Sequence, residues 1–170
     1  MLIFGIDPGC SGAIVAMAMD GNVKGWLNMP TIKVGKQSKV NGPAVIAFIQ
    51  TMIASLPYHH TSLMHAYIEQ VHAMPGQGVV SMFTFGHATG KIEGIIEGFG
   101  IPWTGVTPQA WKKSAGLIGS DKDAARSRAI MLYPTIRVLD KKADGQAVAD
   151  ALLIARHGRI VLQNKRADLI

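Results

Sequence analysis

The stretch "IFGIDPGCSGAIVAMAMDG" (residues 3–21) carries the strongest fold signal in the chain. An apolar run ends on Asp7, passes through a proline and a glycine-rich turn, and resumes as a second apolar run. The Asp20-Gly21 pair that follows is a strong hairpin signal, so the next segment should return antiparallel. We therefore expect an aspartate at the tip of a buried strand, followed by a hairpin, with strands over 2–7, 13–19 and 23–29.

Helices and strands alternate in the rest of the chain. The polar segment 31–41 is expected to be a loop, and Asp144 is expected to be the N-cap of the last helix. Further strands are expected over 62–70 and 101–106, and helices over 43–56, 79–99, 107–116, 121–132 and 145–157. This order predicts an α/β fold with a mixed sheet, built as one domain over 1–158 with a frayed tail over 159–170.

Composition narrows the class of protein. Of 170 residues, 48% are hydrophobic, which argues against disorder. The single cysteine, Cys10, excludes an internal disulfide and a cysteine-based metal cluster. No apolar run is long enough to cross a bilayer, and the N-terminus does not look like a cleavable signal, so we expect a cytoplasmic protein. The formal charge of +6 favours an anionic partner.

A second predicted strand, over 62–70, also ends near an acid, Glu69. If the two strands are neighbours, Asp7 and Glu69 emerge at the same edge of the sheet. The segment "ADGQAVAD" (143–150) then offers Asp144 and Asp150. Carboxylates without a Cys or His framework suit Mg²⁺ or Mn²⁺, and such a cluster can hold two ions that hydrolyse a phosphodiester. The alternative is that Asp7 caps a turn, Glu69 is a surface acid and Asp144 only caps a helix.

The predicted helix over 79–99 carries a glycine at every fourth position, at 86, 90, 94 and 98. Each glycine costs about 0.8–1.0 kcal/mol relative to alanine within a helix, so a structural reason is expected. A smooth ridge of this kind allows another backbone to approach closely. Packing against the sheet and a helix–helix contact in a dimer both remain open.

Four segments together resemble the RuvC-type Holliday-junction resolvases, especially their phage versions. They are "FGIDPGCSGAIV", "YIEQVHAMPGQG", "GIPWTGVTPQAWKK" and "ADALLIARHGR", and they occur in the same order over most of the chain. The resemblance implies a ribonuclease H-like fold with a mixed five-stranded sheet flanked by helices. It also implies a homodimer that cleaves four-way DNA junctions with Mg²⁺, or Mn²⁺ as a substitute, in the cytoplasm of a bacterium or a phage-infected host.

Carried over residue by residue, the resemblance makes Asp7, Glu69 and Asp150 metal ligands. The family commonly has another acid one helical turn before the last one, and here that position is Ala147. We expect Asp144 to substitute, although six residues correspond to about 600° around a helix, so it shares the face of Asp150 poorly. Otherwise the fourth ligand is absent and activity is weakened, or position 147 carries an engineered change.

Contacts with DNA are expected from basic residues close to the acidic edge. Their positive charges would neutralise backbone phosphates, which position DNA without reading its sequence. A solvated basic helix face is an equally good explanation for any one of them. The candidates are Lys112, Lys113, Lys122 and Arg126, with Arg128 close by.

Aromatic residues at the start of the glycine helix are candidates for a wedge that props open the junction centre, as the resemblance implies. Phe83 and Phe85 occupy this position, and we expect at most one of them to be exposed. Ordinary core packing is the alternative. Trp111 is expected to be a packing residue.

Two other functions compete with a junction nuclease. The turn "DPGCSG" resembles the phosphate-binding turn of the actin/sugar-kinase superfamily, although 170 residues leave no room for the second lobe that closes over ATP. A DNA-junction-binding protein with weak or no catalytic activity is the other alternative, and it is motivated by Ala147.

Overall fold

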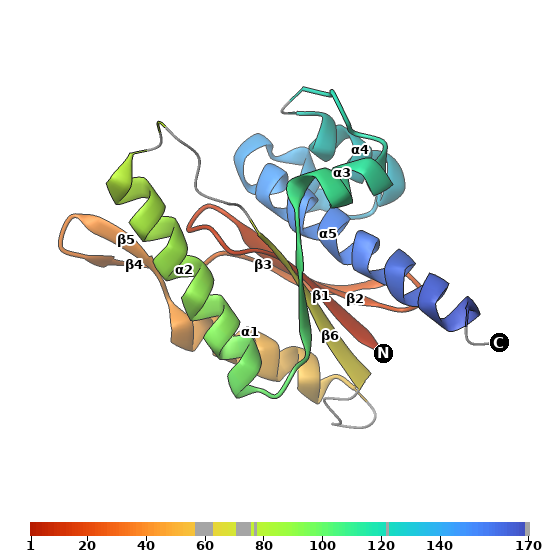
Figure 1. Ribbon diagram of the computed structural model, residues 1–170, viewed down its shortest axis with the longest axis horizontal. Coiled ribbons are helices and arrows are strands. Elements are labelled where there is room, and N and C mark those ends of the chain that lie inside the picture. Colours follow the sequence, from red (N-terminus) through yellow and green to blue (C-terminus); the bar gives the residue numbers. More distant parts are fainter. Residues whose placement is uncertain (57–62, 71–75, 77, 122, 169–170) are drawn as a thin grey trace.

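The computed structural model describes residues 1–56, 63–70, 76, 78–121 and 123–168. Its main sheet has five strands in the order β3-β2-β1-β6-β7 (Figure 1). The N-terminal hairpin pairs are antiparallel, whereas β1–β6 and β6–β7 are parallel. The strands are β1 (Leu2–Asp7), β2 (Ala13–Ala18), β3 (Val23–Asn28), β6 (Met64–Glu69) and β7 (Trp103–Val106). The predicted α/β fold with a mixed five-stranded sheet is confirmed.

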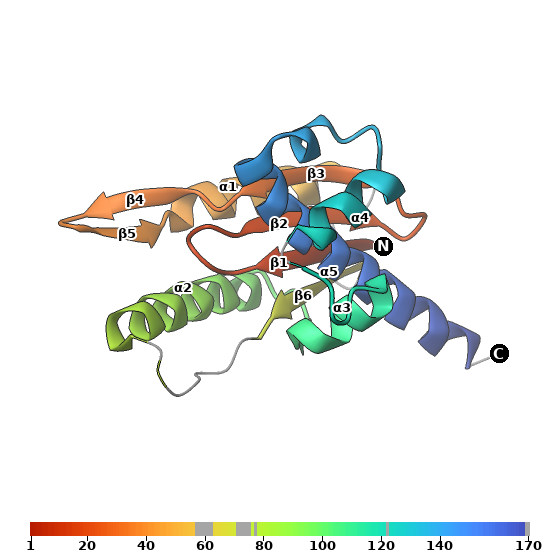
Figure 2. The ribbon, with the colours of Figure 1, turned by 90° about the horizontal axis from the view of Figure 1, so that it is seen from above.

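Helices cover both faces of the sheet (Figures 1 and 2). One face packs against α1 (Gly42–Ala54) and α2 (Val79–Gly98). The other packs against α3 (Pro108–Ala115), α4 (Ala124–Leu132) and α5 (Lys142–Ala167). Because side chains alternate along a strand, Phe4 and Ile6 of β1 face the first pair of helices and Ile3 faces α5. No helix in the described part of the chain has both the length and the apolar character that crossing a membrane requires.

Close contact between β1 and α5 depends on Gly5. A Cβ atom on Gly5 would lie 2.7 Å from the Cα of Ala155 and would also meet the carbonyl oxygen of Ala151. Only glycine allows this approach. The contact lays α5 directly across β1 and brings the helix residues just before Ala151 toward the C-terminal edge of the strand.

Capping at both ends fixes α3 as the sequence predicts. The hydroxyl of Thr107 accepts a hydrogen bond from the backbone N–H of Ala110, and Pro108 begins the helix. Gly116 ends it with a left-handed backbone at φ 74°. This short helix carries Trp111 into the core beneath the edge where β6 ends.

The segment predicted as a polar loop over 31–41 is instead a hairpin of β4 (Thr31–Val34) and β5 (Gln37–Val40). Gly35 has φ 60° in the two-residue turn, which suits a tight hairpin. β-branched residues in both strands favour extended backbone over the loop that the lysines suggested. Figure 2 shows the hairpin projecting at the same end of the molecule as the N-terminal half of α2.

Helix α5 is longer at both ends than predicted. It begins at Lys142, so Asp144 lies within its first turn and the N-cap is Lys141. The tail that we expected to fray is helical through Ala167. Packing explains the helix as far as Leu162, because Leu162 contacts the core and the Tyr67 ring occupies the space where a Cβ of Gly158 would lie. Residues 163–167 are exposed and continue the same helix.

Candidate functional site

Two acids end neighbouring parallel strands. Ile6 pairs with Ile68 in the ladder between β1 and β6, so Asp7 and Glu69 both follow at the same edge of the sheet. Asp150 approaches this edge from α5, immediately before the residue that contacts Gly5. The structure thus brings three of the four predicted acids to one edge.

The pKa of Asp7 reflects its burial and its closeness to the other two acids. Burial of the carboxyl group is the largest cause that raises its pKa, from 3.8 to about 7, and the negative charge of Glu69 adds to it. The backbone N–H of Gly9, which donates to Oδ1 at 3.2 Å, lowers the pKa and only partly offsets these effects. Asp150 contributes a smaller increase. Burial and the charges of Glu69 and Asp150 therefore both disfavour the ionised form of Asp7.

Glu69 is held by a tryptophan. The indole N–H of Trp111 donates to Oε1 of Glu69 at 2.8 Å, and Trp111 is only 2% exposed. Trp111 is a packing residue, as predicted, but its hydrogen bond to the acid was missed. The signal for this contact was weak, because a buried indole usually finds some acceptor but the sequence does not say which one.

Asp150 is held by a glutamine. The side-chain amide of Gln146 donates from Nε2 to Oδ1 of Asp150 at 3.1 Å. Sequence reasoning missed this residue because it considered only the positions three and six residues before Asp150. The usable signal was the four-residue spacing, which places two side chains on the same face of a helix.

The acids are near one another without forming a closed cluster. Within the described residues, no three His, Cys, Asp or Glu side chains are grouped closely enough to hold a metal ion. Each acid is bonded to its own neighbour: Asp7 to Gly9, Glu69 to Trp111 and Asp150 to Gln146.

Two clefts flank this acidic edge. One, of about 500 Å³, is lined by Asp7 together with the hydroxyls of the N-terminal turn, the hairpin and the first turns of α2: Ser11, Thr31, Ser38, Ser81 and Thr84. The other, of about 320 Å³, is lined by Glu69, Asp150 and residues of α3 and α5, among them Trp111, Lys112 and Gln146. A ligand in the first cleft therefore reaches Asp7, and a ligand in the second reaches Glu69 and Asp150.

Asp144 is not brought to the other acids in the same way. It is exposed in the first turn of α5, and its backbone carbonyl accepts a hydrogen bond from the side chain of Asn28 at 3.1 Å. It lines neither cleft and is not among the charges that raise the pKa of Asp7. Its role as the substitute metal ligand stays a prediction.

The predicted basic contacts differ in their surroundings. Lys112 and Lys113 are exposed on α3, and the ammonium of Lys112 lies 5.4 Å from the centre of the Trp111 ring, beside Glu69. Lys122 lies outside the described residues. The side chain of Arg126 is partly buried and donates from Nη1 to the carbonyl of Leu139 at 3.1 Å.

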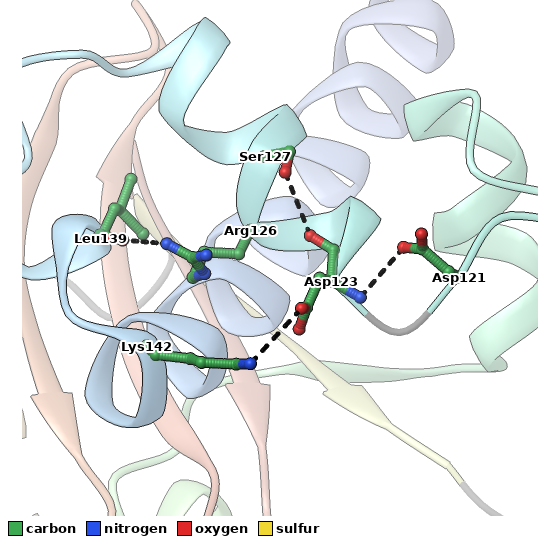
Figure 3. A network of polar contacts seen from close by, with 6 residues as sticks. All are labelled: Asp121, Asp123, Arg126, Ser127, Leu139 and Lys142. Carbon is green, nitrogen blue, oxygen red and sulfur yellow. Dashed lines mark hydrogen bonds and ion pairs between the residues drawn. The ribbon is translucent and has the colours of Figure 1, made fainter.

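Figure 3 shows that Arg126 belongs to a network that ties α4 to the start of α5. In the same network, Lys142 forms an ion pair with Asp123 at 3.8 Å. The contacts of Arg126 within the protein thus anchor the turn that precedes the helix carrying Gln146 and Asp150. Its contact with DNA stays a prediction.

The two phenylalanines have different environments. Phe83 is 73% exposed near the N-terminus of α2, whereas Phe85 is partly buried and lines the cleft that contains Asp7. One of the two is therefore exposed, as predicted. Val79 and Val80 are exposed beside Phe83, so the start of α2 presents an apolar tip.

Replacing Trp111 by phenylalanine should separate its packing from its hydrogen bond. We expect Trp111→Phe to remain folded and to bind Mn²⁺ about 10–100-fold more weakly, because Glu69 loses the donor that orients it. Isothermal titration with Mn²⁺ measures this change. Trp103→Phe is the matched control, since it removes an indole hydrogen bond to Glu97, 3.1 Å long and on α2. Equal affinities in both variants would contradict the role of Trp111.

Solved structures with the same fold include the RuvC resolvase of Thermus thermophilus. The free protein superimposes with a TM-score of 0.58 at 18% identity, over 96% of this chain and 97% of that chain. The T. thermophilus RuvC bound to a Holliday junction substrate gives a TM-score of 0.55 at 19% identity, over 92% and 91%. The chain therefore has the RuvC-like, ribonuclease H-like fold that the resemblance implied.

A curated relative supports the same comparison at the level of sequence. The chloroplastic Holliday junction resolvase MOC1 of Chlamydomonas reinhardtii is 34% identical over 94 residues. The match covers 54% of this chain, and this chain spans only about 10% of the length of that protein. No protein-family model matches the chain.

Proposed function

We propose that the protein is a metal-dependent endonuclease that resolves Holliday junctions and related branched DNA by paired phosphodiester hydrolysis. The observation that carries the proposal is the meeting of Asp7, Glu69 and Asp150 at one edge of a RuvC-like sheet, where burial first, and then the charges of Glu69 and Asp150, raise the pKa of Asp7 to about 7. The likeness to two resolvases, one of them solved with junction DNA, supports the choice of substrate.

The donor atoms at this edge fit Mg²⁺, with Mn²⁺ as a substitute. All are carboxylate or amide oxygens, which hard divalent cations prefer, and a cation would offset the repulsion from Glu69 and Asp150 that helps to raise the pKa of Asp7. We propose Asp7, Glu69 and Asp150 as the ligands, with two ions in each site. Such ions activate water and stabilise the oxygen that leaves a phosphodiester. The protein contributes orientation, since Trp111 and Gln146 fix two of the carboxylates.

DNA is proposed to run along the two clefts. Lys112 lines the cleft beside Glu69, where its charge neutralises a phosphate close to the acids. In the other cleft, hydroxyl groups donate to backbone oxygens, and the ring of Phe85 offers a surface on which a base stacks. The exposed Phe83 is the proposed wedge at the junction centre.

A homodimer is proposed through the glycine face of α2. Ala88, Ile92 and Ile96 face the core, and the glycines at 86, 90, 94 and 98 lie about 200° away, on the opposite side. A Cβ at any of the four would meet nothing within 4 Å, so packing against the sheet does not explain them. The last three border an apolar groove of about 390 Å³ with Ile46, Ile95 and Phe99.

Blocking this groove should separate the subunits. We expect Gly94→Leu to be monomeric at micromolar concentration and to fold normally, because the position is open in the isolated chain and leucine favours helix more than glycine does. Sedimentation equilibrium measures the change, with Lys165→Leu on the exposed end of α5 as a control for an added surface leucine. A dimer unaffected by Gly94→Leu would contradict the proposed interface.

A four-way junction labelled on each strand in turn tests the function. With Mg²⁺ we expect symmetric nicks in two opposing strands and no cutting of a linear duplex of the same sequence. Junction binding without nicks in Mg²⁺ or Mn²⁺ would instead favour a non-catalytic junction-binding protein. Tight ATP binding without DNA binding would favour an actin-like nucleotide-binding protein.

We further propose that residues 1–158 carry the whole activity as one domain. We also propose that the protein acts in the cytoplasm, where bacterial and phage DNA recombine.

A further inference from the structure

The side chain of Gln146 lies next to the proposed metal site and is only half satisfied. Its Nε2 donates to Asp150, but its carbonyl oxygen, Oε1, is buried and accepts no hydrogen bond from any described residue. A carboxylate oxygen accepts hydrogen bonds, so the amide must turn its NH₂ group toward Asp150 and its oxygen away. The pairing of the Gln146 amide with the Asp150 carboxylate therefore explains why Oε1 has no partner in this pair.

A buried acceptor without a donor is costly, and native proteins rarely leave one unexplained. The location suggests what satisfies it. Gln146, Asp150 and Glu69 line the same cleft of about 320 Å³. Amide oxygens are ordinary ligands of hard divalent cations, so a cation held by the carboxylates that line this cleft is a candidate partner for the amide oxygen.

The position on the helix supports the same assignment. Gln146 precedes Asp150 by four residues, about 400° around α5, so the two side chains lie about 40° apart on one face. Ala147, where a resolvase-like sequence commonly has an acid, is 8% exposed and has no donor atom. Gln146, the residue before Ala147, thus offers an oxygen atom in place of the carboxylate that position 147 lacks.

We propose that Gln146 supplies the fourth oxygen ligand of the metal site through Oε1, in place of the acid that Ala147 lacks. This inference rests on the proposed function only in assuming a divalent cation at the acidic edge. A neutral ligand leaves the site one negative charge short, so the bound ion is held more weakly than in a site with four acids. Gln146 then donates a hydrogen bond to Asp150 through Nε2 and binds the ion through Oε1.

Mn²⁺ binding in the absence of DNA tests the proposal, measured by isothermal titration and by the electron paramagnetic resonance of free Mn²⁺. We expect Gln146→Leu to bind about 10–100-fold more weakly than the wild type. Gln146→Glu should bind at least as tightly as the wild type, because it keeps the oxygen and adds charge. Gln50→Leu, at an exposed position of α1 on the opposite face of the sheet, is the matched control and should not change affinity.

Gln146→Glu separates a ligand from a residue that only positions Asp150. If Gln146 acts solely through its NH₂ group, glutamate removes the donor and places a like charge beside Asp150, so binding weakens as much as in Gln146→Leu. That result would overturn the proposal, as would wild-type affinity in Gln146→Leu. Thermal melts of the metal-free variants check that each is folded.

The outcome also distinguishes this proposal from the proposed function. Mn²⁺ binding that depends on Gln146, in a protein that leaves four-way junctions uncut, would support the ligand and refute the nuclease. Junction cleavage by the wild type, together with unchanged Mn²⁺ affinity in Gln146→Leu, would refute the ligand alone. A wild-type protein that binds no Mn²⁺ at millimolar concentration would overturn both.

Discussion

Asp7→Asn is expected to stabilise the metal-free protein by as much as about 4 kcal/mol at pH 8, since its pKa is raised from 3.8 to about 7. The folded protein binds the proton more tightly than the unfolded chain does. Stability from this residue is therefore present below about pH 4 and is lost as the pH rises toward about 7. Asparagine carries no charge and still accepts the Gly9 hydrogen bond, so it avoids this loss.

Urea denaturation in EDTA at several pH values measures the effect. The free-energy difference between Asp7→Asn and the wild type should be close to zero at pH 4 and grow up to pH 8. Mg²⁺ should reduce this free-energy difference, because the ion stabilises only the wild type. Asp20→Asn is the control, since that exposed carboxyl has its pKa lowered by hydrogen bonds from Asn22. A difference independent of pH would contradict the account of Asp7.

Gly12→Ala is expected to disrupt the site from within the N-terminal turn. A Cβ at Gly12 would contact the carbonyl oxygen of Asp7 and lie 2.7 Å from its carboxyl carbon. The backbone has little room to move, because Gly12 bonds to Gly9 and to Met29, each at 2.9 Å. We expect a loss of about 1–3 kcal/mol of unfolding free energy, typical of overpacking, and at least a tenfold loss of Mn²⁺ affinity.

Gly9→Ala is the matched control for this variant. The nearest atoms to a Cβ at Gly9 are Oδ1 of Asp7 and a ring carbon of Phe85, each at 3.6 Å, and both are ordinary contacts. Urea denaturation and Mn²⁺ titration should therefore give values close to those of the wild type. If the two variants behave alike, the turn does not hold Asp7 in the way described.

Much of the fold is predictable from the sequence because local signals agree with packing. The apolar run ending at Asp7, the Asp20-Gly21 turn and the Thr107–Gly116 caps each identify an element that the structure contains. The hairpin of β4 and β5 was missed because its lysines suggested a loop, although Gly35 and the β-branched residues favour strands. The end of α5 was missed because its stability comes from packing of Leu162 against distant residues.

The candidate site was predictable only in part. Acids at strand ends have a sequence signal, and three of them meet at one edge as expected. The hydrogen-bond partner of Glu69 has no such sequence signal, because Trp111 lies 42 residues away along the chain. Gln146 had a local signal in its four-residue spacing from Asp150. It was not predicted as a site residue because its side chain is uncharged. The glycines of α2 were recognised, and only the fold showed that they face away from the core.

We propose that Asp7 belongs to a metal centre that cuts branched DNA. The most direct measurement compares the wild type with Asp7→Asn on one labelled four-way junction in Mg²⁺, following binding by mobility shift and cleavage on a denaturing gel. We expect symmetric nicks by the wild type that EDTA abolishes, and a variant that binds the junction without cutting it. Cleavage by Asp7→Asn at the wild-type rate would contradict it.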